Sequence, residues 1–471
     1  MSSPTMGTSP IPEDQCWSSP TFKLKEELRK GMYEEDGIEQ CDFFRRSDST
    51  FDFARLRSTS SSSAEEQELE LGPRNTGSPG RWPSLPEWPE LDPAAFERGK
   101  ALLGSMEMDP TCFSRDDLCH LALEIFEATG LPDELAADVG RVRRFILAIR
   151  ERMFPNAYHN FYHVFDVTQT VSVIARRTGT LDRLNAWERF ALLAAAFCHD
   201  LEHPGVSSVF LDHAGPSVAG AFKDTVLERH HVIRAFEVMV RQDIGLLKGL
   251  SSESYWDFRN AVAGCILATD FAKHSSYSEQ VRELVQEGAS RPAIQLEMEL
   301  IIKCADISNV LKPFPIARRW ALRVTDEFFA QGDVERARGM HVTPFCDRRT
   351  ASRVGLQVGF IDAVCAPFFD AMATLYPGLG IDVERMHANR QRWASYSDTD
   401  LEAFRRAQHV SQHPPPRLVT CPTEAHNLPI SHESADHAGG GSPGQLTPGL
   451  QGMLFPLFPL FPDAGGAPHN L

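Results

Sequence analysis

Four side chains at three places in the chain have the chemistry to bind a divalent metal ion together. They are His163, the adjacent pair His199 and Asp200, and Asp306. Imidazole nitrogen suits zinc, whereas carboxylate oxygen suits magnesium and manganese as well. A metal cage of this composition that keeps open coordination positions activates water, so hydrolysis is the first reaction that these residues indicate.

Helices must position these ligands, because apolar residues recur at three- and four-residue spacing around them. Residues 187–199 and 297–307 each read as one buried helix. Asp200 and Asp306 therefore stand where apolar helical runs end, a costly place for a carboxylate that is neither paired nor metal-bound. The Pro-Gly pair at 204–205 ends the first helix and leaves room beyond it.

A further pair of histidines, His159 and His163, stands four residues apart. If the segment is helical, both imidazoles share one face. Both then bind one metal ion, or one binds while the other reaches into the site. Each histidine alone is explained more simply as a hydrogen-bonded core or surface residue. The whole set, with His230 and His231 added, favours a functional centre.

Composition narrows the class of protein. The formal net charge is −17 over 471 residues, and no basic patch stands out, so we expect no nucleic-acid partner. Ten cysteines are scattered without a CxxC pair, which is typical of a reducing compartment. We find no signal-peptide pattern and no apolar run long enough to cross a membrane. The expectation is a cytoplasmic protein without a transmembrane segment.

Amino-acid composition and apolar periodicity divide the chain into three parts. Residues 1–92 are rich in Ser, Pro, Gly and charge, which predicts a disordered arm. Residues 93–412 carry the helical periodicity and few alternating strand patterns, which predicts a single compact all-α domain of roughly ten or more helices. Residues 413–471 contain three consecutive prolines near their start and are predicted to be a disordered Pro/Gly-rich tail.

The two terminal segments contain features that suggest regulation or partners. Ser47 and Ser58 follow arginines, a pattern that basic-directed kinases recognise, and a phosphate there could order nearby arginines. The apolar segment 453–462 is interrupted by prolines, which exclude a spanning helix. It suits a docking motif, a membrane-surface contact, or packing on the chain's own body. A homodimer is a further expectation.

Six motifs carry a resemblance in their order along the chain. They are His159-Asn160-x2-His163, His199-Asp200-x2-His203-Pro204-Gly205, Glu228-x-His230-His231, Ala268-Thr269-Asp270, Lys303-x2-Asp306-x-Ser308-Asn309 and Gln357-x-Gly359-Phe360-Ile361. Together they resemble the catalytic domain of class I 3',5'-cyclic nucleotide phosphodiesterases, over roughly residues 95–410. Segments 266–270 and 302–309 are most similar to the type 9, cGMP-preferring branch, with types 1 and 8 not far off. The resemblance implies an all-α domain of the HD-type metal-dependent phosphohydrolase kind.

The resemblance also implies two metal ions and a general acid. His163, His199, Asp200 and Asp306 match the ligands of the tighter site, usually zinc. Asp200 would bridge to a second ion, usually magnesium (or manganese), whose other ligands are mostly water. His159 matches the general acid that protonates the departing 3'-oxygen.

Further matches surround the metal ions. His203, Glu228 and His231 match groups that hold metal-bound waters and phosphate. For His203 the alternative interpretation is a cap of the local helix. These three residues are therefore expected to lie around the ligands rather than among them.

Five residues match the part of the family's site that binds the substrate. Gln357 corresponds to the purine-reading glutamine, and Phe360 to the aromatic ring that stacks on the base. Val324 falls at the opposite wall, and Asn309 is assigned to substrate binding. Phe328 stands where relatives often carry tyrosine, so one anchor for the Gln357 amide is lost. A free amide pairs with adenine or guanine, because it offers both a donor and an acceptor.

The implied activity is hydrolysis of a 3',5'-cyclic purine nucleotide to the nucleoside 5'-monophosphate, which would terminate cyclic-nucleotide signalling. Branch similarity favours cGMP over cAMP. The alternatives are a dual-specificity or cAMP-preferring enzyme, another HD-type nucleotide phosphohydrolase, and a non-catalytic sensor.

Overall fold

The computed structural model describes residues 84–214, 226–288 and 291–412. Every regular element in these ranges is a helix, which confirms the prediction of an all-α fold. Nearly all of the predicted arm and tail lies outside the described residues, including Ser47, Ser58 and segment 453–462.

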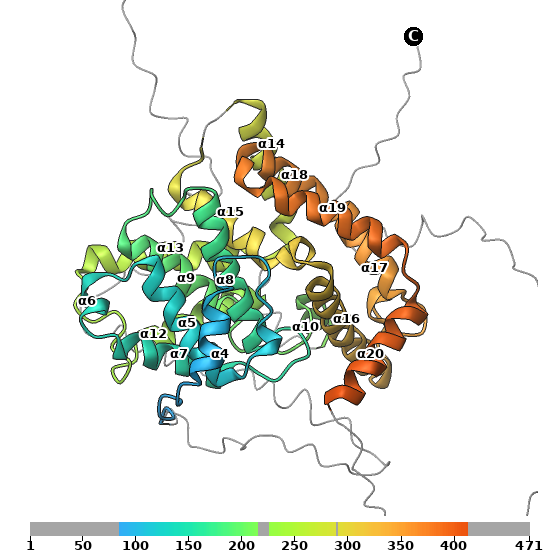
Figure 1. Ribbon diagram of the computed structural model, residues 1–471, viewed down its shortest axis with the longest axis horizontal. Helices are drawn as coiled ribbons and strands as arrows, with labels where there is room; N and C mark the ends of the chain where they lie inside the picture. Colours follow the sequence, from blue (N-terminus) through green and yellow to red (C-terminus); the bar gives the residue numbers. More distant parts are fainter. Residues whose placement is uncertain (1–83, 215–225, 289–290, 413–471) are drawn as a thin grey trace, which may run out of the picture. The chain divides into compact units, whose positions relative to one another are not determined.

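Figure 1 shows the helices coloured in chain order. The α-helices are α4 (Pro93–Lys100), α5 (Arg115–Thr129), α6 (Asp133–Ala136), α7 (Gly140–Arg152), α8 (Phe161–Arg177), α9 (Ala186–Cys198), α10 (Ser208–Ala214), α12 (Val226–Met239), α13 (Ser252–Ala268), α14 (His274–Gln286), α15 (Ile294–Asp306), α16 (Phe314–Ala337), α17 (Arg353–Phe360), α18 (Ala366–Leu375), α19 (Gly380–Ala394) and α20 (Asp398–Gln412). The short turns are η2 (Pro110–Cys112), η3 (Phe271–Lys273), η4 (Ser308–Leu311), η5 (Pro344–Cys346), η7 (Pro377–Leu379) and the π-helical turn η6 (Ile361–Cys365).

Four helices form the centre of the core. α9 packs against α8 and α13, and α15 packs against the same two helices. Every residue of α9 from Phe190 to Cys198 is buried, as expected for a helix that is apolar all round. The predicted helices at 187–199 and 297–307 are confirmed as α9 and α15. Their C-terminal ends carry the aspartates that the sequence singles out.

Local sequence determines where the helices near these aspartates begin and end. The capping box of Asn185 and Glu188 starts α9. The side chain of Asn160 starts α8, since it accepts hydrogen bonds from the second and third N–H groups of the helix. His163 lies in this first turn of α8, and α15 ends at Asp306. The predicted metal ligands thus lie at or next to helix termini.

The predicted arm includes residues 84–92, but this segment lies against the helices. Leu85 and Trp88 pack against the core, and the Trp88 ring meets His120 edge-on at 5.2 Å. His120 Nε2 also donates to the Pro89 carbonyl oxygen at 2.9 Å. The proline-rich composition predicts disorder here, but Leu85 and Trp88 bury part of their apolar surface against the core.

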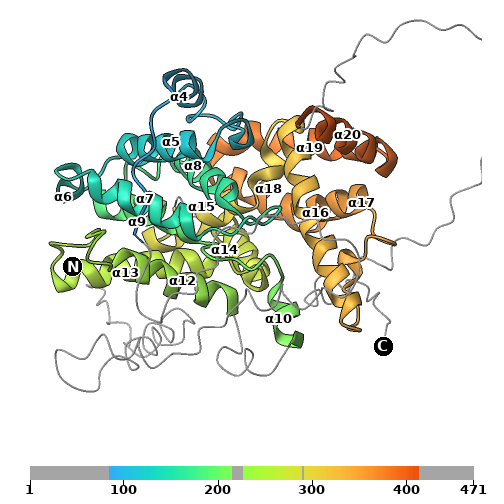
Figure 2. The same cartoon turned by 90° about the horizontal axis from the view of Figure 1, so that it is seen from below.

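The C-terminal helices form a second layer beside the core (Figures 1 and 2). α16 packs against η4, η5 and α17. The continuous run Arg353–Leu375, which joins α17, η6 and α18, is the one described helical segment long and apolar enough to cross a membrane by length and composition alone. It packs against α14, α16 and α19, as a helix inside a folded domain does. We therefore interpret it as a domain helix.

Candidate active site

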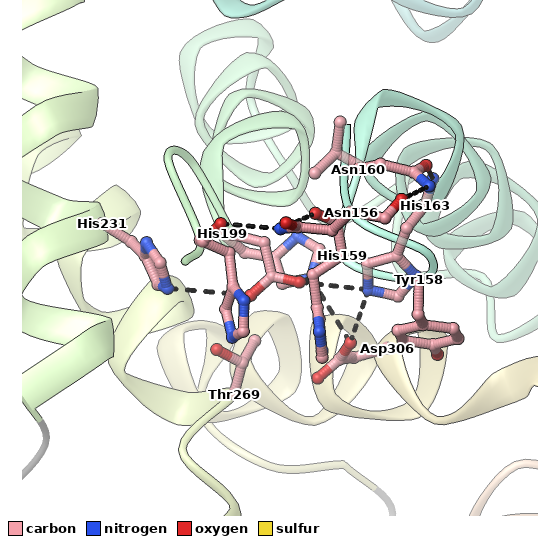
Figure 3. Close-up of polar contacts among 12 residues, drawn as sticks. Asn156, Tyr158, His159, Asn160, His163, His199, His231, Thr269 and Asp306 are labelled. Atoms are coloured by element: carbon pink, nitrogen blue, oxygen red, sulfur yellow. Dashed lines mark hydrogen bonds and ion pairs between the residues drawn. The ribbon is translucent and has the colours of Figure 1, made fainter. Parts of the chain in front are cut away.

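Four predicted metal ligands meet at one place, although they come from three parts of the fold (Figure 3). His163 belongs to α8, His199 and Asp200 follow α9, and Asp306 ends α15. His163 Nε2 lies 3.2 Å from Asp200 Oδ2 and 3.3 Å from Asp306 Oδ1. His199 Nε2 lies 3.3 Å from each of the same two oxygens. Two imidazoles and two carboxylates therefore face one common point.

The separations between these ligand atoms fit a divalent metal ion. Tetrahedral zinc with ligands at about 2.0–2.1 Å places its ligand atoms about 3.3–3.4 Å apart. Nε2 of both histidines and Oδ2 of Asp200 are buried, with no hydrogen-bond partner among the described residues. His199 Nδ1 donates to the Ala196 carbonyl oxygen at 2.8 Å, so Nε2 keeps the lone pair that a metal requires.

Electrostatics at this point favour a positive charge. Burial alone would lower the pKa of His199, but Asp200 and Asp306 raise that pKa well above its ordinary value. Burial would raise the pKa of both aspartates, but the neighbouring histidines hold both pKa values well below the usual range. The ionised carboxylates are paired with positive charge on the histidines, and a metal ion at the same point would take the place of the His199 Nε2 proton.

His159 is held separately from the ligands by a buried carboxylate on α16. Its Nδ1 is hydrogen-bonded to Glu327 Oε1. Glu327 Oε2 accepts the backbone N–H groups of Tyr158 at 2.7 Å and His159 at 3.1 Å. Burial would lower the pKa of His159, but Glu327, together with Asp200, raises it to about 9. The imidazole is therefore protonated near neutral pH and suited to donate a proton from Nε2.

Sequence reasoning missed Glu327, although a signal for it exists. Glu327 follows Trp320 and Val324 at helical spacing, so it belongs to the apolar face of α16. A carboxylate on such a face is almost never left without a partner. That rule indicates a buried partner for Glu327, but it does not identify His159, which lies in a distant part of the chain.

Replacing Glu327 with glutamine should lower kcat by about 10- to 100-fold and move the alkaline limb of the kcat–pH profile to lower pH by about one unit or more. Only the protonated form of His159 donates, so activity falls as pH rises through its pKa. Loss of the Glu327 charge lowers that pKa. The measurement is kcat against pH over about pH 6–10.

Glu335 offers a matched control for this substitution. It is also a buried glutamate of α16, but it binds Thr343 and Gln331 rather than His159. Glu335→Gln should leave the alkaline limb in place. An unmoved limb in Glu327→Gln, or the same shift in both variants, would contradict the role given to Glu327.

His203 and His231 lie beside the ligands, as the sequence predicts for supporting groups. The His203 ring stacks on His159, with 3.9 Å between ring centroids and 24° between planes. His203 Nδ1 accepts the N–H of Gly205 at 3.0 Å, a bond within the local turn rather than a helix cap. His231 Nδ1 donates to a carbonyl oxygen at 2.8 Å, and its Nε2 lies 3.8 Å from Asp200 Oδ1 (Figure 3).

Glu228, the third predicted supporting group, lies on α12 and is partly buried. Its Oε2 is buried and has no hydrogen-bond partner among the described residues. Burial and the neighbouring charge of Asp270 raise the pKa of Glu228 to about 7. Near neutral pH this carboxyl group is partly protonated, so it can accept a hydrogen bond from water, or donate one to water, close to the metal site.

The residues expected to bind the base lie on two neighbouring helices. Gln357 and Phe360 belong to α17, and Val324 and Phe328 belong to α16, which packs against α17. The Phe328 ring packs on another ring, Phe345, with 5.1 Å between centroids. All four of these residues are partly buried rather than fully buried in the core. The structure therefore places the two helices that carry the predicted walls next to each other.

Tyr158 is a second residue that sequence reasoning did not single out. It is buried, and its ring centroid lies 4.6 Å from that of His163 and 4.8 Å from that of His159. Its hydroxyl accepts a hydrogen bond from Asn309 Nδ2. The predicted substrate residue Asn309 is thus connected to the metal ligands through one tyrosine.

Comparison with known proteins agrees with this geometry. Residues 158–385 match the family described as 3'5'-cyclic nucleotide phosphodiesterase. The 3',5'-cyclic-nucleotide phosphodiesterase regA of Dictyostelium discoideum is 32% identical over 326 residues, which are 68% of this chain and 41% of the relative. The high affinity cGMP-specific 3',5'-cyclic phosphodiesterase 9A of Drosophila melanogaster is 33% identical over 320 residues, with shares of 66% and 21%. The chain spans less than half the length of either relative.

Comparison with a solved structure shows that the similarity extends to the three-dimensional fold. The structure of LmjPDEB1 in complex with IBMX is 31% identical, with a TM-score of 0.58, and the match covers 64% of this chain and 97% of that one. This likeness confirms the predicted fold, and the phosphodiesterase 9A match supports the resemblance to the type 9 branch. The chain belongs to the 3',5'-cyclic nucleotide phosphodiesterase family.

Proposed function

We propose that this chain hydrolyses 3',5'-cyclic purine nucleotides to nucleoside 5'-monophosphates and so ends their signal. The observation that carries the proposal is the four-ligand arrangement of His163, His199, Asp200 and Asp306 beside an oriented His159. Zinc with magnesium or manganese would be held by these ligands and supplies Lewis acidity that lowers the pKa of water and neutralises phosphate charge.

The reaction needs one proton transfer that this chain's own residues provide. The oxygen of a water molecule forms a new bond to phosphorus while the bond from phosphorus to the 3'-oxygen breaks in line with it. His159 gives its Nε2 proton to the 3'-oxygen, and Glu327 stabilises and orients the imidazolium before transfer. One proton of the water stays on the phosphate or passes to solvent, and the other restores His159.

Base preference belongs to the same proposal. We infer that cGMP is favoured over cAMP, which is supported by similarity to a relative named as cGMP-specific. A second relative carries a name that specifies neither base. Sequence similarity therefore supports the preference for cGMP, without an argument from any individual side chain.

One observation favours dual specificity as the second candidate. The side chain of Gln357 makes no hydrogen bond within the described ranges, and Phe328 on the facing helix has no hydroxyl to anchor it. An unanchored amide rotates to present either its donor or its acceptor, so it reads guanine and adenine alike. If this second candidate holds, we expect a preference for cGMP below about tenfold, the range of the net contribution of one hydrogen bond.

Replacing Phe328 with tyrosine should raise the preference between the two bases several-fold, by about 3- to 10-fold, because the added hydroxyl restricts the Gln357 amide. Gln357→Ala should raise KM for both nucleotides about tenfold or more. The measurement is kcat/KM for cGMP and cAMP in parallel. If Phe328→Tyr leaves the preference between cGMP and cAMP unchanged, and Gln357→Ala leaves KM for both nucleotides unchanged, then α17 does not recognise the base.

We further propose a cytoplasmic location. All seven described cysteines are free thiols, which supports a reducing compartment. The test is fractionation of cells that express the full chain, with recovery in the membrane fraction as the contrary result.

A further inference from the structure

Asn156, in the loop between α7 and α8, connects two catalytic segments through one amide group (Figure 3). Its Nδ2 donates to the carbonyl oxygen of His159 at 2.8 Å and to that of His203 at 2.7 Å. A primary amide has two N–H donors, so both are used. The main chain just before α8 is thereby tied to the turn that follows Asp200.

A second asparagine extends this connection to the metal ligands. Asn160 Nδ2 donates to the carbonyl oxygen of Asn156 at 2.8 Å. Asn160 Oδ1 in turn accepts the backbone N–H of His163 at 3.3 Å as it caps α8. The general acid His159, the ligand His163 and the supporting residue His203 thus share one small hydrogen-bond network.

The turn that Asn156 holds is strained. Glu202 is the one non-glycine residue with positive φ, 62°, among the described residues. Arg152 and Arg234 bind its carboxylate from α7 and α12, the latter at 2.7 Å. These contacts secure one side of the turn, and the bond from Asn156 to the His203 carbonyl secures the other.

These contacts together bear on the position of the proposed general acid, His159. The His159 and His203 rings stack at 3.9 Å, a separation that depends on the spacing of their two main-chain segments. Glu327 holds the Nδ1 side of the His159 ring, while Asn156 holds its backbone. Proton transfer demands correct placement of the donor, and small displacements cost large factors in rate.

We propose that Asn156 is a positioning residue that sets His159 against His203 for proton donation to the leaving oxygen. This inference rests on the proposed phosphodiesterase function. A role in folding alone would lower stability and metal binding along with turnover. A positioning role lowers turnover while the four metal ligands remain in place.

The test compares Asn156→Ala with Gln169→Ala in the full chain. Gln169 is a matched control, because its buried amide also donates to two carbonyl oxygens, those of Leu103 and Ser105, but from the middle of α8. We expect kcat for cGMP to fall about 10- to 100-fold in Asn156→Ala, with KM and bound zinc within about twofold of the wild type. Gln169→Ala should lower the melting temperature without this fall in kcat.

A second probe and a second variant make the outcome specific. Bis(4-nitrophenyl) phosphate releases nitrophenolate, which leaves without a proton, so Asn156→Ala should lose less activity on this compound than on cGMP. Asn156→Ser keeps one donor and should recover part of the loss. Three results for Asn156→Ala would each overturn the proposal. They are equal losses of activity on both compounds, a loss of zinc in proportion to kcat, and an unchanged kcat. A wild-type chain that turns over neither cyclic nucleotide would instead refute the proposed function.

Discussion

Replacing Asp306 with alanine should lower kcat/KM for a cyclic purine nucleotide by at least about a thousandfold. Asp306 Oδ1 lies 3.3 Å from the Nε2 atoms of both His163 and His199, so its loss opens one corner of the four-ligand site. It also removes the negative charge that attracts a cation. The measurement pairs steady-state kinetics with the zinc content of the purified variant, and both should fall together.

An exposed aspartate provides the control for this prediction. Asp362 lies in the turn η6 and pairs with Arg390 at the surface. Asp362→Ala removes the same charge and should leave zinc content and kcat within about twofold of the wild type, as most surface substitutions do. Metal-dependent turnover that survives in Asp306→Ala would contradict the assignment of the site.

His159→Ala should lower kcat by about 10²- to 10⁴-fold while the bound metal stays near the wild-type amount. The two histidines His159 and His163 left two interpretations open in the sequence, since both could bind one ion. In the structure the His159 Nδ1 atom is hydrogen-bonded to Glu327, and the cluster of His159, His203 and Glu327 is separate from the cluster of His163, His199 and Asp306. A proton donor therefore explains His159 better than a ligand.

Metal analysis separates the two interpretations. His163→Ala serves as the comparison, because His163 Nε2 faces both ligand carboxylates. It should lose zinc, whereas His159→Ala should keep it. If His159→Ala loses as much zinc as His163→Ala, His159 is a ligand and the acid must be sought elsewhere.

The core helices and the metal ligands were predictable because each depends on local sequence. Apolar periodicity marks α9 and α15, and the cost of burying a carboxylate draws attention to Asp200 and Asp306. The resemblance to the family adds the expected roles of residues such as Gln357 and Phe360, which stay predictions. The all-α fold follows from the same periodicity.

The residues that orient the acid were not predictable, because their function depends on tertiary contacts. Glu327 reaches His159 from another helix, and Asn156 reads as an ordinary loop residue until its two acceptors are known. The position of residues 84–92 against the helices also involves a tertiary contact, the one between the rings of Trp88 and His120. Spacing along the chain indicates that Glu327 is buried, but it does not identify the partner of any of these residues.

Metal-dependent turnover of cGMP and cAMP by the full chain is the most direct test of the central claim. The protein is stripped with a chelator, reloaded with zinc and magnesium, and followed by phosphorus NMR. We predict that the nucleoside 5'-monophosphate forms only after reloading, and that Asp306→Ala forms it at least about a thousandfold more slowly. Full metal loading without conversion of either nucleotide, or equal conversion by the stripped protein, would contradict the account.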